Sequence, residues 1–195
     1  MLTCKPILPE NTQCFEHDSD LCKNLKELQN VEMRESFSAV EPSLVDKPES
    51  VRPAGLEVGR LESSQVAGVR LVLVTSLPVS YPDQFYKRLG RGELEGRVGV
   101  TAGRVVACVV WGQERGNTHL LALAVLPTHR GRGIGSCLLA ACLATATRPF
   151  LHVQTDNASA VRFYSRHGFT VVKTVPDYYR RQLCRDAFRM ELAVP

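Results

Sequence analysis

The sequence predicts an α/β (α+β) fold, with a mixed central sheet of about seven strands and about four helices, from the order of its helical and strand-like segments. An apolar, strand-like run at residues 120–126 leads into a glycine-rich turn, and a helix-forming run at 136–146 follows at once. A second extended segment, 150–154, precedes a helix that begins at Asn157 and ends at Gly168. Strands and helices therefore alternate in this region, which is typical of a sheet covered by helices.

The segments on either side complete the sheet. Residues 64–75 are ambiguous, because their apolar spacing fits one face of a helix while the β-branched content of 69–74 suits a strand. Pro82 suits the first turn of a short helix. In order, the other predicted elements are an edge strand at 56–61, a loop at 77–82, a helix at 83–89, strands at 96–101, 104–111 and 118–126 joined by turns at 102–103 and 112–117, and strands near 170–175 and 187–193.

Charge divides the chain into two parts. Residues 1–54 hold six Lys and Arg against ten Asp and Glu, a net charge of −4, whereas residues 55–195 hold 18 against ten, a net charge of +8. The first part is rich in Pro, Ser, Glu and Asp, and its one short helical pattern, Leu21, Leu25 and Leu28, is marginal in water by itself. We therefore predict an acidic, disordered N-terminal leader over 1–54 and one domain over 55–195. The basic domain suits a polyphosphate cofactor. No aromatic-basic motif accompanies the charge, so we expect no direct nucleic-acid partner.

The seven cysteines are odd in number and form no C-x-x-C pair, which favours reduced thiols in a cytosolic or nuclear protein. An alternative is a zinc site near the N-terminus, built from Cys4, Cys14, His17 and Cys22. Their spacing is irregular, so we expect no metal. No apolar run reaches the ~20 residues that a membrane helix needs. The N-terminus also shows neither a signal peptide nor a lipid-anchor motif, so we expect no membrane association.

The glycine-rich turn is a candidate anion site, and it consists of Arg130, Gly131, Arg132, Gly133, Ile134 and Gly135. Glycine lets the backbone approach an oxyanion closely. The first amides of the helix that follows have no internal acceptors and lie at the positive end of the helix dipole. Such a turn also serves as a plain strand-to-helix connection, so the turn alone does not decide the function.

The two halves of this region together resemble the Gcn5-related N-acetyltransferase (GNAT) superfamily. The first motif is Arg130-x-x-Gly133-x-Gly135, and the second is Asn157…Phe163-Tyr164…Gly168-Phe169. The resemblance implies a GNAT acyl-CoA N-acyltransferase fold, in which the strands at 118–126 and 150–154 splay apart. It also implies acetyl-CoA as the cofactor.

Further motifs resemble the N-terminal acetyltransferases of the NatE type, which modify the α-amino group of proteins. These motifs are Leu77-Pro78-Val79-Ser80-Tyr81 with Phe85-Tyr86-Lys87, Leu151-His152-Val153-Gln154, and Tyr178-Tyr179-Arg180-Arg181 with Asp186-Ala187. The resemblance implies that the substrate is a peptide N-terminus, with initiator methionine preferred ahead of a second, hydrophobic residue. It also implies NatA-type scaffold and catalytic subunits as partners near the ribosome, and a cytoplasmic location that extends to the nucleus.

The chemistry is attack of an amine on a thioester, and an α-amino group with a pKa near ~8 needs only a mild base. The resemblance implies that His152 is this base, acting through an ordered water. His119 stands where the family has a tyrosine that helps to hold that water, and a neutral imidazole can donate or accept a hydrogen bond in its place. Tyr164 is the candidate general acid for the leaving thiolate.

The resemblance also assigns binding roles. For the cofactor, the expected residues are the backbone amides of Leu123 and Val125 as oxyanion donors, the loop Arg130, Gly131, Arg132, Gly133, Ile134 and Gly135, and Asn157 and Tyr164. For the substrate they are Leu77, Pro78, Val79 and Tyr81 around the first side chain, His152, and Tyr178 and Tyr179 over the peptide backbone.

Several departures keep other functions open. The leader has no counterpart in the family, the segment between Gly135 and His152 is shorter than usual, and Leu77 replaces a phenylalanine. One alternative is a lysine or small-amine acetyltransferase, although the tyrosine pair suits a peptide terminus better. Another is a weakly active, CoA-binding subunit of a larger N-terminal acetyltransferase complex, which His119 and the shortened segment would favour.

Overall fold

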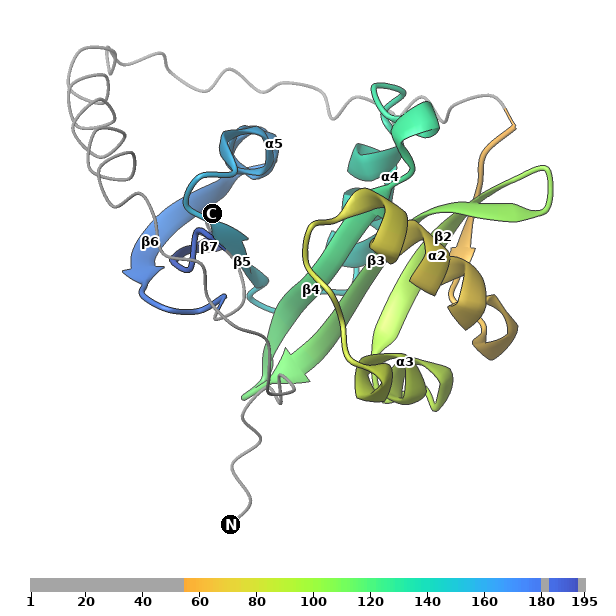
Figure 1. Cartoon of the computed structure of the whole chain (residues 1–195), viewed down its shortest axis with the longest axis horizontal. Helices are drawn as coiled ribbons and strands as arrows, with labels where there is room; N and C mark the ends of the chain where they lie inside the picture. The colour runs from red at the N-terminus through yellow and green to blue at the C-terminus, as the bar shows by residue number, and fades with distance from the viewer. Residues whose placement is uncertain (1–54, 180–182, 193–195) are drawn as a thin grey trace. The chain divides into compact units, whose positions relative to one another are not determined.

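The computed structural model describes residues 55–179 and 183–192, and Figure 1 shows a seven-stranded mixed sheet there. The strands are β1 (Glu57–Arg60), β2 (Glu95–Thr101), β3 (Arg104–Glu114), β4 (Asn117–Val125), β5 (Phe150–Gln154), β6 (Phe169–Val175) and β7 (Ala187–Leu192). Their order in the sheet is β1-β2-β3-β4-β5-β7-β6. The pair β4 and β5 is parallel, and the other neighbouring pairs are antiparallel. The predicted fold class and element order are confirmed.

Helices cover both faces of this sheet. They are α2 (Val66–Ser76), α3 (Asp83–Gly90), α4 (Ile134–Leu143) and α5 (Ala158–Arg166), with 3₁₀ turns η1 (Ser63–Gln65) and η2 (Pro127–His129). The ambiguous segment 64–75 is mainly helical, because Val69, Val72 and Leu73 share one face that is fully buried against the sheet. Leu71 and Val74 occupy the opposite, exposed face of α2.

Two apolar cores lie on the two sides of the sheet. Helices α2 and α3 pack on one face, where Leu73 and Phe85 meet Val98, Cys108 and Val110. Helix α4 and the inner side of α5 pack on the other, around the largest fully buried side chains there, Trp111, Phe169, Leu138, Leu139, Leu151 and Met190. Because the side chains of a strand alternate between faces, each strand residue can be assigned to one core or the other.

The turn predicted at 112–117 is shorter than expected. Strand β3 continues to Glu114, and only Arg115 and Gly116 form the turn, with φ of 52° and 80°. Two consecutive residues of positive φ match the twist of a two-residue hairpin, which lets both strands extend to their tip. Glu114 is therefore a strand residue, paired with Asn117.

Strand β4 changes its relation to both neighbours halfway along. Val110 pairs with Ala122 and Trp111 with Leu120, so Leu121 is the extra residue of a β-bulge. The parallel pairing with β5 stops at the same level, because it comprises only His119 with Phe150 and Leu120 with Leu151. Beyond this point β4 and β5 diverge, as Figure 1 shows. The predicted splay is confirmed.

Several predictions concern residues outside the described ranges. These are the acidic leader over 1–54 with its leucine pattern, the alternative zinc site of Cys4, Cys14, His17 and Cys22, and the basic pair Arg180 and Arg181. Within 55–179 and 183–192, no three His, Cys, Asp or Glu side chains are grouped so that they could hold a metal ion. No helix in the same ranges is long and apolar enough to cross a bilayer.

Candidate active site

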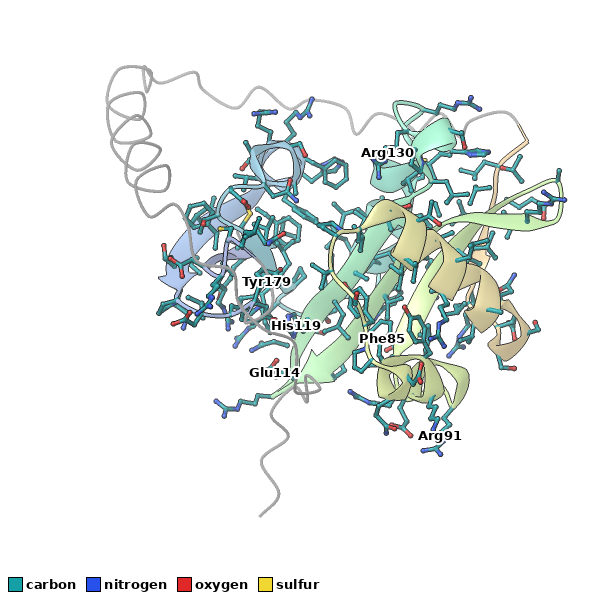
Figure 2. The ribbon with its side chains drawn as sticks, viewed as in Figure 1. Phe85, Arg91, Glu114, His119, Arg130 and Tyr179 are labelled. Atoms are coloured by element: carbon teal, nitrogen blue, oxygen red, sulfur yellow. The ribbon has the colours of Figure 1, made fainter. Side chains whose placement is uncertain are left out.

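Two histidines meet where β4 and β5 begin to diverge. His119 belongs to the last paired stretch of β4, and His152 is the first residue of β5 beyond that pairing. Their neighbours Leu120, Leu151 and Val153 point into the core under α4, so both histidines project from the face that carries α2 and α3. Figure 2 labels His119 on β4.

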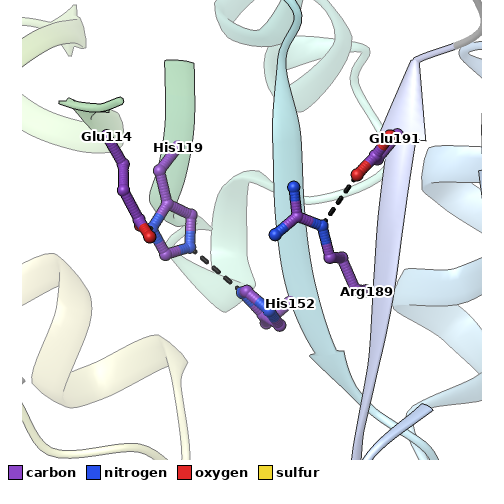
Figure 3. Close-up of polar contacts among 5 residues, drawn as sticks. All are labelled: Glu114, His119, His152, Arg189 and Glu191. Carbon is purple, nitrogen blue, oxygen red and sulfur yellow. Dashed lines mark hydrogen bonds and ion pairs between the residues drawn. The ribbon is translucent and has the colours of Figure 1, made fainter. Parts of the chain in front are cut away.

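The histidine rings are in direct hydrogen-bonding contact. His152 Nδ1 lies 3.2 Å from His119 Nε2, and the ring planes are inclined at 72°. The other nitrogen of His119, Nδ1, lies 3.2 Å from a carboxylate oxygen of Glu114. Phe150 stacks on the His119 ring with centroids 4.4 Å apart. The two rings are joined directly (Figure 3), and the action of His152 on the substrate through an ordered water remains a prediction.

Burial controls the charge of both rings. Removal from water lowers the pKa of His119, against the opposing effect of the Glu114 carboxylate. Burial, and then the charges of His119, Arg189 and Lys173, lowers the pKa of His152 to about 3. Both rings are therefore neutral near pH 7, and His152 is present as an unprotonated, weakly basic imidazole on which a proton would not stay.

Two tyrosines of the β6–β7 loop enclose His152. The Tyr178 ring stacks on the His152 ring with centroids 4.2 Å apart and planes inclined at 16°. The Tyr179 hydroxyl donates a hydrogen bond of 3.0 Å to the backbone carbonyl of His152. Burial raises the pKa of Tyr178 to about 12 and that of Tyr179 further, so both stay protonated. The structure thus brings together Tyr178, Tyr179 and His152, as the sequence predicted.

The loop between α2 and α3 is attached to β4 at its bulge. The Tyr81 hydroxyl donates to the carbonyl of Leu121 over 2.8 Å, and its ring packs against Phe85 with centroids 4.5 Å apart. Leu77 and Val79 are half-buried, and Pro78 is exposed. The four residues expected around the first substrate side chain, Leu77, Pro78, Val79 and Tyr81, therefore lie on a loop that is held next to the diverging part of β4.

The glycine-rich loop connects β4 to α4. Gly131 and Gly133 have φ of 73° and 75°, which L-residues rarely adopt, and both face open space where a Cβ would be. Gly133 is the N-cap of α4, a ten-residue helix. The amides of the first turn thus meet an open side of the loop, at the positive end of the dipole.

Arg130 has a different contact set from the one expected. Its Nε donates to the carbonyl of Val125 over 3.1 Å, and a terminal nitrogen donates to the carbonyl of Ser76 over 3.0 Å. The guanidinium therefore joins the end of β4 to the end of α2, at the opposite end of β4 from Glu114 (Figure 2). Arg132 is exposed and supplies the loop with a second positive charge.

Comparison with known proteins identifies this architecture. A model of the acetyltransferase (GNAT) family matches residues 72–169, which is half of the chain. The chain belongs to the GNAT family of acetyltransferases. N-alpha-acetyltransferase 50 of Danio rerio is 31% identical over 136 residues, which cover 65% of this chain and 81% of that protein.

Solved structures agree on the fold. Ard1 from Thermoplasma volcanium has a TM-score of 0.63 at 26% identity, covering 72% of this chain and 99% of that one. Arabidopsis thaliana Naa50, solved with the bisubstrate analogue CoA-Ac-MVNAL, has a TM-score of 0.62 at 24% identity, covering 72% of this chain and 99% of that one. This GNAT chain is an acyltransferase that depends on acetyl-CoA.

The residues of the loop fit acetyl-CoA. Its diphosphate needs several donors on an open surface, and the first amides of α4 beside Gly131 and Gly133 provide that arrangement together with Arg132. Arg130 holds the loop in shape through its two carbonyl contacts, and its binding of the diphosphate remains a prediction. The cofactor supplies the acetyl group as a thioester, whose carbonyl carbon is open to attack by an amine.

The diverging part of β4 turns backbone groups away from β3. Leu126 N–H donates to Val106 on β3, so alternation turns the amides of Leu123 and Val125 towards the other edge, where β5 no longer pairs. The carbonyl of Val125, which faces the same edge, accepts from Arg130. The role of the Leu123 and Val125 amides as oxyanion donors remains a prediction that this orientation favours.

Helix α5 carries the second cofactor motif. Asn157 caps the helix, because its side-chain oxygen accepts from the amide of Ala160 over 3.1 Å, and its binding of the cofactor remains a prediction. The Tyr164 ring contacts Phe163 and Phe169 edge-on, and burial raises the pKa of its hydroxyl. A protonated phenol can supply a proton to a thiolate, so this protonation state is the one that a general acid needs. The role of Tyr164 as a general acid remains a prediction.

Sequence reasoning missed two side chains of the site. Glu114 was assigned to a turn, although the dipeptide Arg115-Gly116 could have indicated a tight hairpin in which Glu114 is a strand residue. Arg189 lies directly opposite His152 in the β5–β7 register, with its guanidinium 4.1 Å from the Phe150 ring centroid and 2.7 Å from Glu191. Only knowledge of that register would have placed it beside the histidine.

Proposed function

We propose that this GNAT enzyme transfers the acetyl group of acetyl-CoA to the α-amino group of protein N-termini, with a preference for initiator methionine followed by a hydrophobic residue. The observation that carries the proposal is the enclosure of His152 by Tyr178, stacked on its ring, and Tyr179, bonded to its carbonyl. A chain terminus brings its amine and its first peptide group to the base together, and the tyrosine pair borders that approach.

The loop of Leu77 and Val79 supports an apolar first residue, because half-buried aliphatic side chains favour burial of another apolar group. The similarity to an N-alpha-acetyltransferase of Danio rerio supports the α-amino group as acceptor. Action in the cytoplasm, on chains that emerge from the ribosome and together with a NatA-type scaffold, belongs to the same proposal.

The residues have defined tasks in this reaction. His152 takes one proton from the α-ammonium group, which leaves the neutral amine as nucleophile. Backbone donors on the open edge of β4 bind the carbonyl oxygen as negative charge develops on it. Tyr164 on α5 gives a proton to the leaving sulfur and is reprotonated by the second proton that the nitrogen loses as the amide forms. The sum is one amine and one thioester converted to one amide and one thiol.

The test is release of coenzyme A by the purified full chain with acetyl-CoA and a set of peptides. The set has Met-Leu, Met-Lys, Ser-Ser and Asp-Asp starts, and one peptide with a blocked terminus and an internal lysine. We expect turnover with the free methionine-starting peptides, the highest with Met-Leu, and its loss in His152→Gln with an unchanged melting temperature.

Two results would overturn the proposal. Turnover of the blocked peptide at a comparable rate would identify a lysine acetyltransferase. Tight binding of acetyl-CoA, measured by calorimetry, with no turnover of any peptide would identify a cofactor-binding subunit instead of an enzyme for N-termini.

A further inference from the structure

We propose that Glu114 is a positioning residue of the active site, which orients His119 and through it His152, so that Glu114, His119 and His152 form a proton relay from the substrate amine to solvent. This inference rests on the proposed function, because the amine of the substrate is the proton donor. It concerns the direct contact between the two histidine rings, which the sequence did not predict.

The hairpin register creates the contact between Glu114 and His119. His119 pairs with Gly112, and Glu114 is two residues further along β3, which makes it the diagonal neighbour of His119 on the same face. Gly112 has no side chain between them. A Cβ on Gly112 would lie 3.0 Å from the Leu94 side chain, so Leu94 leaves little room for a larger residue at position 112. The carboxylate thus reaches the ring over 3.2 Å.

The hydrogen bonds determine which nitrogens carry protons. A carboxylate only accepts, so Nδ1 of His119 carries its proton and donates to Glu114. The ring of His119 is neutral, so its Nε2 has a lone pair and accepts from His152 Nδ1–H. His152 therefore holds its proton on Nδ1 and presents an unprotonated Nε2, which is the nitrogen able to accept the proton of an amine.

The surrounding charges direct the proton away from His152. Arg189 on β7 and Lys173 on β6 both disfavour positive charge at His152, and Tyr178 stacks on its ring without charge. Arg189 disfavours positive charge at His119 as well, but there the Glu114 carboxylate has the larger, opposite effect. His119 has the one carboxylate in contact with either ring among the described residues. The His119 side chain is 13% exposed and that of Glu114 is 57% exposed. The path from His152 through His119 to Glu114 therefore leads from the buried part of the site to water.

The relay balances as two proton shifts. The ammonium group of the substrate gives one proton to His152 Nε2, and His152 passes the proton on its Nδ1 to His119 Nε2. His152 is then neutral again, and His119 is an imidazolium paired with the Glu114 carboxylate. Loss of the Nδ1 proton of His119 to water beside Glu114 completes the outward transfer and leaves each ring with one proton, on Nε2. Each ring then releases this proton to water and takes one from water at Nδ1, which restores the starting tautomers.

The first test observes the tautomers without any substrate. Side-chain ¹⁵N NMR of the histidines distinguishes protonated from unprotonated ring nitrogens. For the wild-type chain we expect Nδ1 protonated and Nε2 unprotonated in both His119 and His152. Glu114→Leu removes the acceptor, and we expect it to release His119 from this tautomer and to move the His152 proton towards Nε2. Unchanged ¹⁵N signals of both rings in Glu114→Leu would overturn the proposal.

The matched control is Glu191→Gln. Glu191 is a second carboxylate near the pair, but it is bonded to Arg189 and not to a histidine (Figure 3). Its substitution removes the same charge from the same region. We expect the tautomers of His119 and His152 to remain as in the wild-type chain, and a change as large as that of Glu114→Leu would assign the effect to general charge.

The second test separates orientation from charge. Glu114→Gln keeps an oxygen that accepts from His119 but cannot stabilise an imidazolium, so we expect the tautomers to persist while kcat falls at least ~10-fold, with an unchanged KM for acetyl-CoA. Glu191→Gln should stay within about twofold of wild type. A kcat for Glu114→Gln equal to that of Glu191→Gln would contradict the relay. If the wild-type chain acetylates no peptide, the proposed function fails, and the NMR result still decides whether Glu114 orients the histidines.

Discussion

The Tyr179 hydroxyl donates a hydrogen bond of 3.0 Å to the backbone carbonyl of His152, at the point where the pairing of β5 with β4 ends. In a continuous parallel sheet that carbonyl would be available to the neighbouring strand. Because β4 has turned away, the carbonyl takes its donor from the β6–β7 loop instead. The same bond therefore closes the edge of β5 and ties the β6–β7 loop to the strand that carries His152.

Tyr179→Phe is expected to weaken both functions of this bond. Loss of one partner of a partly buried hydrogen bond costs about 1 kcal/mol of unfolding free energy. Since the loop is then attached less firmly, KM for peptide should rise several-fold, while KM for acetyl-CoA stays constant. Urea unfolding and steady-state kinetics check this. An unchanged KM for peptide would show that the hydroxyl serves stability alone.

Arg130→Lys is expected to damage the cofactor loop through its shape. The guanidinium joins two carbonyls, of Val125 and Ser76, and a lysine ammonium cannot reproduce that planar bidentate geometry. We expect a lower melting temperature without ligand and a KM for acetyl-CoA raised roughly tenfold, which is about 1.4 kcal/mol of binding energy.

Arg132→Met provides the comparison for Arg130. The Arg132 side chain is exposed, so its removal should leave the melting temperature unchanged and weaken acetyl-CoA binding mainly through charge. The loss should shrink as salt is added. If Arg130→Met also keeps its melting temperature and loses affinity in the same salt-sensitive way, Arg130 binds the diphosphate instead of holding the loop.

The fold could be predicted from the sequence where local patterns and family motifs agreed. The strand, glycine-rich loop and helix around Gly133 are local, so they were placed to within a few residues. Residues 64–75 could not be assigned, because valine and leucine fit either a helix or a strand. The segment is helical because one face of α2 packs against Val110 and Cys108, and this tertiary interaction cannot be seen in the local sequence.

The candidate site was predictable only in part for the same reason. His152, Tyr178 and Tyr179 follow from motifs, and the structure brings them into contact. The pair of Glu114 and His119 depends on a two-residue turn and on the absence of a side chain at Gly112, which together set the register. A one-residue shift would place the carboxylate on the opposite face of the sheet.

The pH dependence of kcat/KM is expected to follow the substrate and not the base. Burial lowers the pKa of His152 to about 3, so the ring is already neutral throughout the range from about pH 5 to about pH 9. A peptide α-amino group has a pKa near ~8, and only its neutral form attacks. Log kcat/KM should rise with unit slope to about pH 8 and then level off.

A change of peptide provides the check on this assignment. A peptide whose α-amino pKa is lower should shift the rising part of the kcat/KM profile to lower pH, by the difference between the two pKa values. If the rise of kcat/KM occurs at the same pH for every peptide, it reports a group of the enzyme. That result would mean that the pKa of His152 lies near its ordinary value.

Stability is expected to fall on acidification because of the same histidine. The pKa of His152 is lower in the folded chain, about 3, than the ~6.5 of an unfolded chain, so between these values the unfolded state binds the extra proton. The contribution is complete above about pH 6.5 and is lost as pH falls towards 3. The burial of His119, which also lowers its pKa, acts in the same direction.

Urea unfolding of wild type and His152→Gln at a series of pH values measures the effect. The wild-type free energy of unfolding should drop more steeply, by less than about 1.4 kcal/mol per pH unit because solvent screens the half-buried ring. Above about pH 7 the difference between the two chains should be constant, which is the internal control. Parallel curves between about pH 4 and about pH 6 would show that His152 is not held neutral by burial.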